Sequence, residues 1–119
     1  MATRQEIGRR GEDLAAAYVT ERGWRVLDRN WRSGAVGELD LVALDGDALV
    51  AVEVKTRSSA AFGHPAEAVT ADKVARLRRL TARWLAAHDL HPASVRIDVL
   101  AIVLAPGRAP RIDHLAAVV

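Results

Sequence analysis

Residues 37–57, GELDLVALDGDALVAVEVKTR, carry four charged side chains of types that can do chemistry together: Glu38, Asp40, Glu53 and Lys55. Paired carboxylates bind divalent cations through oxygen, and a lysine beside them can orient water or stabilise a phosphate charge. The rest of the segment reads as two strands rich in Val, Leu and Ala, where buried charges are costly without a partner. These four side chains therefore either face water or converge on a site that needs them.

A tight turn at Asp-Gly or Gly-Asp is expected to join the two strands. Side chains alternate between the faces of a strand, so Glu38 and Asp40 share one face with Glu53 and Lys55. A turn at residues 45–46 would set Asp40 opposite Ala51, whereas a turn at 46–47 would set Asp40 opposite Glu53 and Glu38 opposite Lys55. In both registers the other face is apolar and consists of Leu39, Leu41, Ala43, Val50, Val52 and Val54.

The charges gather at one end of their face, which continues as Val42, Leu44, Leu49 and Ala51. Two carboxylates about 5 Å apart repel by roughly 3 kcal/mol at an effective dielectric of about 20. A solvated face with a few ion pairs is one interpretation of this pattern. A mostly buried face with charges at one end instead favours a cleft, and a divalent cation would relieve the repulsion there.

Capping signals and hydrophobic spacing predict the order α-β-β-β-α-β-β. The T-x-x-E spacing from Thr3 to Glu6 starts a first helix that Gly23 ends, and Thr70 caps a second helix reaching about His88. Strands are expected at 24–31, in the opening segment, at 94–104 and at 111–115, with a loop at 58–68. This order predicts an α/β sandwich, a mixed central sheet flanked by helices, as a single domain over residues 1–119.

Composition narrows the class of protein. There is no Cys, and the four His form no HExxH pattern, so Cys-ligated zinc and a zincin are excluded. No apolar run approaches the roughly 20 residues that span a bilayer, and the N-terminus lacks the apolar core of a signal peptide. We therefore expect a cytoplasmic protein with no membrane partner. The net charge is only +2, so an argument for nucleic-acid binding depends on where the arginines lie.

Asp40, Glu53 and Lys55 form the pattern D-x12-E-x-K, which resembles the PD-(D/E)xK nuclease signature. The segments GRRGEDLAAAYV, RNWR, GELDLVA, VAVEVKTR, FGHPAEAVTADK and RIDVLAI resemble, in this order, the YraN-like family of small bacterial proteins. The resemblance runs from about Ile7 to His114 and implies the fold of the restriction-endonuclease-like superfamily. One departure is that Leu39, rather than Pro, precedes Asp40.

The resemblance implies roles for five residues. Asp40 and Glu53 would be metal ligands together with the Val54 carbonyl, and Lys55 would be the catalytic lysine. Glu12 matches the helix acid of archaeal Holliday-junction resolvases, as a further metal ligand or catalytic acid. Oxygen ligands favour Mg²⁺ or Mn²⁺ over zinc. The implied activity is a divalent-metal-dependent DNA endonuclease acting on branched or damaged DNA, with a homodimer if both strands are cut.

Other residues are expected to support this site. Glu38 either pairs with Lys55 or joins the metal shell, and Lys73 points into the cleft. Arg76, Arg79 and Arg83 form an outward stripe on the second helix that can contact phosphates, or can simply be solvated. The remaining candidates for nucleic-acid contact are Asn30, Arg32, Arg57 and Lys73.

Two further readings stay open, a non-catalytic nucleic-acid-binding module on the same fold and a protein-interaction adaptor. Away from the site, Asp98 is expected to serve a structural hydrogen-bond or ion-pair role, and the histidines to be structural or exposed. Gly8 and Gly11 weaken the first helix, and close packing on the sheet would explain them.

Overall fold

The computed structural model describes residues 2–59 and 69–118. Two helices and five strands follow the predicted order α-β-β-β-α-β-β, which is confirmed. The elements are α1 (Arg4–Glu21), β1 (Arg25–Ser33), β2 (Gly37–Asp45), β3 (Ala48–Arg57), α2 (Ala71–His88), β4 (Ser94–Val103) and β5 (Arg111–Leu115). Most of the loop expected at 58–68, including His64, lies outside the described residues.

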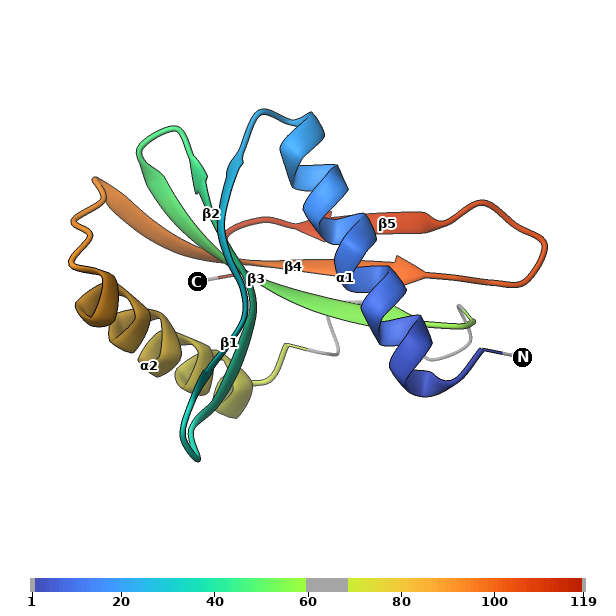
Figure 1. Cartoon of the computed structure of the whole chain (residues 1–119), viewed down its shortest axis with the longest axis horizontal. Helices are drawn as coiled ribbons and strands as arrows, with labels where there is room; N and C mark the ends of the chain where they lie inside the picture. Colours follow the sequence, from blue (N-terminus) through green and yellow to red (C-terminus); the bar gives the residue numbers. More distant parts are fainter. Residues whose placement is uncertain (1, 60–68, 119) are drawn as a thin grey trace.

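All five strands form one mixed sheet in the order β1-β2-β3-β4-β5 (Figure 1). The β3–β4 pair is parallel and the other three pairs are antiparallel. A parallel pair needs a long crossover connection, and α2 lies in this one. The predicted mixed sheet with flanking helices is therefore confirmed as an α/β architecture.

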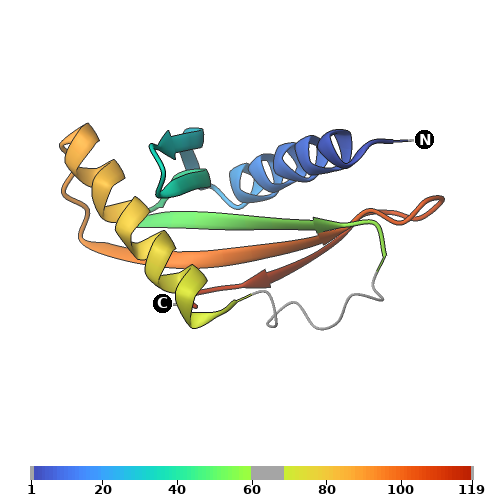
Figure 2. The same ribbon diagram turned by 90° about the horizontal axis from the view of Figure 1, so that it is seen from below.

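The helices pack on opposite faces of the sheet, because alternation along the central strands builds two separate cores. Ala15 and Val19 of α1 pack with Val50 and Val52, whereas Leu80 and Trp84 of α2 pack with Leu49 and Ala51. Figure 2 shows β3, β4 and β5 side by side, with α1 and α2 set apart from one another. Neither α1 nor α2 is long and apolar enough to cross a membrane, and the described ranges contain no other helix.

Both predicted N-caps are confirmed. The Thr3 hydroxyl accepts a hydrogen bond from the Glu6 amide at 3.1 Å, and the Thr70 hydroxyl accepts one from the Lys73 amide at 3.2 Å. Each bond satisfies an amide that the first turn of a helix leaves without a partner. The second cap fixes where α2 begins and so places Lys73 in its first turn.

Gly11 is where α1 approaches the sheet most closely, as expected from its cost to the helix. A Cβ added at Gly11 would lie 2.8 Å from Cβ of Thr56 on β3, whereas one at Gly8 would meet nothing within 4 Å.

We expect Gly11→Ala to lower the free energy of unfolding by about 1–3 kcal/mol through overpacking. Gly8→Ala, the matched control, should raise it by up to about 1 kcal/mol. Urea unfolding measures both, and equal effects would contradict this explanation of Gly11.

Candidate active site

Asp40 lies where the sheet forks. The β2–β3 ladder runs from the Asp45–Ala48 pair to the Leu41–Val52 pair and stops one residue before Asp40. Beyond this point β2 stays paired with β1, and β3 stays paired with β4. The Val54 amide, past the last β2 pair, donates a hydrogen bond to Asp40 Oδ2 at 2.9 Å. The Asp40 carboxylate thus occupies the opening of the fork and holds the two strands at a fixed separation.

The observed register is one of the two predicted, with Gly46 and Asp47 as the turn. Asp40 and Glu53 are the residues that follow the last pair, Leu41 and Val52, on these two adjacent strands. Two expectations beyond the fork are wrong. Leu39 joins the core under α2 rather than the one under α1, and Glu38 pairs with Arg32 instead of Lys55, with 3.2 Å between Arg32 Nη2 and Glu38 Oε2. The Glu38 result follows from the separation of β2 and β3, because cross-strand pairing ends with the ladder. The side of Leu39 does not follow from it, since β2 stays paired with β1 at that residue.

The environment of Asp40 strongly favours its neutral form. Burial raises the pKa of Asp40 from its ordinary 3.8 to about 7, helped by the negative charge of Glu53 and, more weakly, of Glu12 and Glu38. The hydrogen bond from the Val54 amide acts in the opposite direction but is outweighed. This carboxyl group is therefore only partly ionised at neutral pH, and perturbed groups of this kind gather at functional sites.

Glu53 lies on the α2 side of the fork and has a cation beside it. Lys73 Nζ from the first turn of α2 lies 3.1 Å from Glu53 Oε1, and both side chains are largely buried, at 22% and 16% exposed. The prediction that Lys73 points toward the acidic site is therefore confirmed. Glu53, Lys55 and Lys73 line a pocket of about 10 Å³, which is room for about one water.

A second pair of acids lies on the α1 side. With its amide oriented to donate, the Asn30 nitrogen lies 3.0 Å from Glu12 Oε1 and 3.1 Å from Glu38 Oε1. Burial raises the pKa of Glu12, and the Glu38 charge adds to this, against the hydrogen bond from Asn30. Asn30 reaches this position with a left-handed backbone, φ 53°. Sequence reasoning assigned Asn30 to phosphate contact and missed this bridge between two carboxylates.

The donor set fits a divalent cation that takes few protein ligands. Within residues 2–59 and 69–118, no three carboxylate or imidazole groups form a ready-made metal cluster. Mg²⁺, however, commonly binds through one or two carboxylates and keeps its remaining waters. Asp40 and Glu53 supply two carboxylates, and Lys73 already stands beside Glu53 as a positive charge. The Val54 carbonyl faces the same gap, because a strand residue presents its N–H and C=O to one side.

The predicted arginine stripe on α2 is exposed and lies beside the β1–β2 turn. Arg76, Arg79 and Arg83 are all solvent-exposed, and Arg83 Nη1 donates to Ser33 Oγ at 3.2 Å. A Cβ added at Gly37 would lie 3.6 Å from Arg76 Cδ, so that side chain also reaches the turn. Arg32 extends from the same hairpin and is 70% exposed. Arg76, Arg79 and Arg83 therefore share an exposed surface of α2, whereas Arg32 lies with Glu38.

The fold and the site define a class: an α/β protein with a forked mixed sheet and an acidic centre flanked by lysines. The chain belongs to the family described as Uncharacterised protein family UPF0102, whose model matches residues 11–102. The YraN-like membership predicted from the sequence is therefore confirmed.

Relatives in this family match nearly the whole chain. A UPF0102 protein of Beutenbergia cavernae is 56% identical over 118 residues, which covers 99% of each chain. One from Arthrobacter sp. (strain FB24) is 50% identical over 118 residues, with the same coverage. One from Streptomyces coelicolor is 51% identical over 115 residues, covering 96% of this chain and 88% of the relative.

Proposed function

We propose that this protein is a divalent-metal-dependent DNA endonuclease with the fold of the restriction-endonuclease-like superfamily. The observation that supports this most strongly is the position of Asp40 and Glu53 just past the last β2–β3 pair, near enough for the Glu53 charge to act on Asp40, with Lys55 two residues further along β3. A bound Mg²⁺ or Mn²⁺ would neutralise charge at phosphorus and make water more acidic. Asp40, Glu53 and the Val54 carbonyl would hold it, and Glu12 would contribute through water.

The chain's own residues have separate tasks in this proposal. Lys55 lines the small pocket beside Glu53 and would orient the attacking water or bind a phosphate oxygen. Lys73 holds Glu53 in place through the buried ion pair. Asp40 must lose its proton before it can hold a cation, so cleavage should rise with pH through about 7.

Branched or damaged DNA is the proposed substrate class, and its motivation is Glu12. Glu12 comes from a different element than Asp40 and Glu53, and its charge still affects the pKa of Asp40. A homodimer would supply two sites for cutting both strands of such a substrate, since one domain carries one acidic centre.

A second candidate function is supported by the Glu53–Lys73 ion pair itself. The ammonium group lies where positive charge is needed beside Glu53, so the acidic centre is partly neutralised without metal. A chain of this kind would bind nucleic acid through Arg76, Arg79 and Arg83 without cutting it. Such binding would weaken with salt and would not depend on divalent cations.

The test is a cleavage assay with linear duplex, single-stranded, flapped and four-way-junction DNA in Mg²⁺, Mn²⁺ or EDTA. We expect cutting in Mg²⁺ or Mn²⁺ that stops in EDTA and is lost in Lys55→Ala, with the four-way junction as the preferred substrate. Circular dichroism of the Lys55→Ala protein provides the folding control. Salt-sensitive binding without cutting would instead establish the second candidate function, and cutting that survives Lys55→Ala would refute the site.

A further inference from the structure

Cations without a carboxylate partner gather at the end of the molecule where α1 begins. Elsewhere, five cations each lie within 4.0 Å of a carboxylate oxygen, namely Arg29, Arg32, Lys73, Arg96 and Arg111, whereas the exposed arginines of α2 have no such partner among the described residues. Arg4, Arg10, Lys55 and Arg108 likewise form no ion pair with any residue of the described ranges. Their positions in the sequence are far apart, and the fold alone brings them together.

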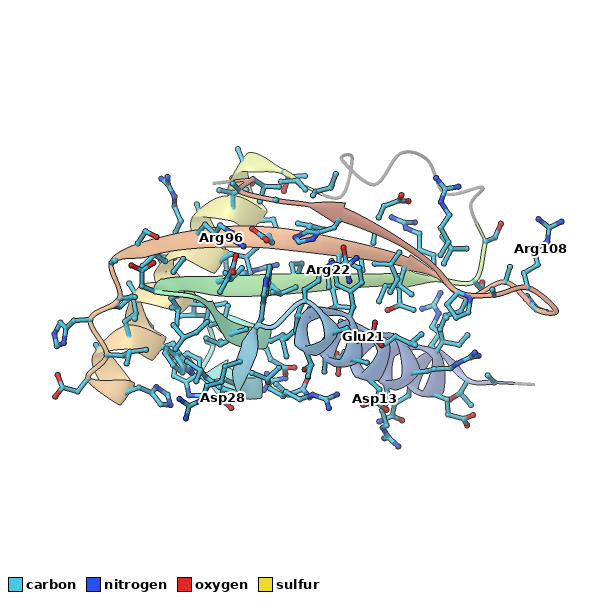
Figure 3. All side chains as sticks on the ribbon, turned by 90° about the horizontal axis from the view of Figure 1, so that it is seen from above. Asp13, Glu21, Arg22, Asp28, Arg96 and Arg108 are labelled. Carbon is cyan, nitrogen blue, oxygen red and sulfur yellow. The ribbon has the colours of Figure 1, made fainter. Side chains whose placement is uncertain are left out.

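These four cations line two adjoining pockets, which together are called the groove. One part, about 440 Å³, is lined by Arg4, Lys55, Arg57 and Ser58 together with Ile7, Gly8 and Thr56. The adjoining part, about 750 Å³, shares Ile7 and Ser58 and extends to Arg10 and Arg108. Figure 1 shows why: the start of α1, the end of β3 and the β4–β5 turn lie at the same end of the molecule. Arg108 projects from that turn in Figure 3.

The groove selects an extended anion. Five cationic side chains line its two parts, and Glu6 is the single acid among the described residues that line them. Gly8 leaves its floor open, since a Cβ there would meet nothing within 4 Å. The volume exceeds that of a single phosphate site and falls in the range of pockets that enclose whole ligands.

Lys55 connects this groove to the acidic centre. It lines the groove beside Arg4 and also the small pocket beside Glu53 and Lys73. A chain of phosphates lying in the groove would therefore be led to Asp40 and Glu53. None of the described residues that line the groove is aromatic, so these residues offer no platform for stacking bases.

We infer that this groove binds the phosphodiester backbone of one nucleic-acid strand on its way to or from the acidic centre. The choice of ligand rests on the proposed nuclease function. Because the contacts are to phosphate alone, binding is independent of sequence and similar for DNA and RNA strands. The groove lies apart from the arginine stripe on α2, so the strand is held on both sides of Lys55.

The experiment compares two variants of the full chain that lose the same charge. Arg4→Gln/Arg108→Gln removes two groove cations, and Arg22→Gln/Arg25→Gln removes two exposed arginines just beyond the other end of α1. The 18 residues of α1 separate the two sites by about 27 Å. Fluorescence anisotropy of labelled 20-nucleotide dT and U strands in EDTA, between 50 and 200 mM NaCl, gives Kd and its salt dependence.

We expect the groove variant to bind both strands about tenfold more weakly than wild type at 50 mM NaCl. Its slope of log K against log[NaCl] should be shallower by about 1.4, since each phosphate contact on a single strand contributes about 0.7. The control variant should stay within twofold of wild type. Circular dichroism confirms that both variants are folded.

Three results would overturn the inference: equal weakening in the two variants, no weakening in either, or no strand binding by wild type. Cleavage in Mg²⁺, measured on the same proteins, separates this inference from the proposed function. If wild type cuts DNA and the groove variant binds strands as well as wild type, the nuclease proposal is supported and the groove inference is refuted. If binding depends on the groove but no protein cuts DNA, the groove inference is supported and the nuclease proposal is refuted.

Discussion

Asp40→Asn is expected to make the protein more stable at pH 8 and to abolish cleavage. The carboxylate of Asp40 is destabilised by burial and by Glu53, and an amide removes that charge while its oxygen can still accept the Val54 hydrogen bond. The amide nitrogen can in turn donate to a neighbouring acid. We expect the free energy of unfolding at pH 8 to rise by about 2–3 kcal/mol, since a tenfold change in proton affinity corresponds to about 1.4 kcal/mol.

The pH dependence gives this prediction its sign. The pKa of Asp40 is about 7 in the folded chain and near 3.8 in the unfolded chain, so between these values the folded state holds more protons. Wild-type stability should therefore fall as pH rises from about 4 to 7 and then level off. The gain from Asp40→Asn should appear across the same range and vanish below pH 4.

Metal gives a second measurement on the same pair of proteins. If Asp40 holds a cation, Mg²⁺ or Mn²⁺ at 100 times its Kd should stabilise wild type by about 2.7 kcal/mol, and should not stabilise Asp40→Asn. Cleavage in Mg²⁺ should fall at least about 1000-fold in the variant, comparable to losing one key charge-stabilising group.

Asp13→Asn is the matched control. Asp13 is 63% exposed, pairs with Arg29 and lies on the outer side of α1 (Figure 3). It should change stability by less than about 1 kcal/mol and leave the response to metal intact. Thermal unfolding over pH 4–9 with and without Mg²⁺ checks both variants. A loss of stability in Asp40→Asn at pH 8, or an unchanged response to Mg²⁺, would contradict the description of this site.

The sequence predicts well what local chemistry determines. The capping threonines and the spacing of apolar residues were enough for both helices and the order of all seven elements. Alternation along the strands was enough to place Glu53 on the opposite face from Val50 and Val52, because β4 pairs with β3 along its whole length.

The features that sequence reasoning missed depend on tertiary placement. Glu38 lies beyond the fork, and no local signal marks where two strands separate. The bridge from Asn30 to Glu12 needs α1 and β1 in place together. The groove needs Arg108 beside Arg4, and these residues stand at opposite ends of the chain. A charge count of +2 contains no trace of either arrangement.

Asp98→Ala should be the most destabilising of the substitutions considered. Asp98 is fully buried on β4 and accepts hydrogen bonds from Arg96 Nε at 3.1 Å, His114 Nε2 at 2.8 Å and the Ala117 amide at 2.8 Å. The expected structural role is thereby confirmed. Its removal would leave these donors without their shared acceptor, and we expect a loss of about 3–5 kcal/mol.

The loss is large because the cluster around Asp98 ties four parts of the fold together. Arg96 also donates a hydrogen bond from Nη2 to Asp45 Oδ2 on β2, at 2.9 Å. The Tyr18 hydroxyl of α1 is hydrogen-bonded to His114 Nδ1 of β5, at 3.2 Å. Burial opposes the positive charge of Arg96, but the hydrogen bonds that Arg96 donates to Asp45 and Asp98 outweigh it and raise the pKa of Arg96. Arg96 lies on β4 among the central strands (Figure 3).

The control is Asp113→Ala, which removes a surface pair with Arg111 and should cost less than about 1 kcal/mol. Asp98→Asn separates hydrogen bonding from charge. One amide oxygen can serve the Arg96 side or the His114 side but not both, and its NH₂ group would face a donor. We therefore expect a loss of about 2–4 kcal/mol by urea unfolding. If Asp98→Asn and Asp113→Ala lose the same amount, the cluster does not anchor the sheet.

The anchoring of β4 by Asp98 also bears on the acidic centre. Asp98 pairs with Val52 and its neighbour Val99 pairs with Glu53, so the cluster holds the strand that fixes Glu53 on one side. The Asp40 carboxylate fixes the other side through Val54. Glu53 is thus positioned from two directions. The buried network around Asp98 stabilises the fold, whereas the buried carboxylate of Asp40 destabilises it. Folded Asp98→Asn should for that reason keep its response to Mg²⁺, whereas Asp40→Asn should lose it while remaining the more stable protein.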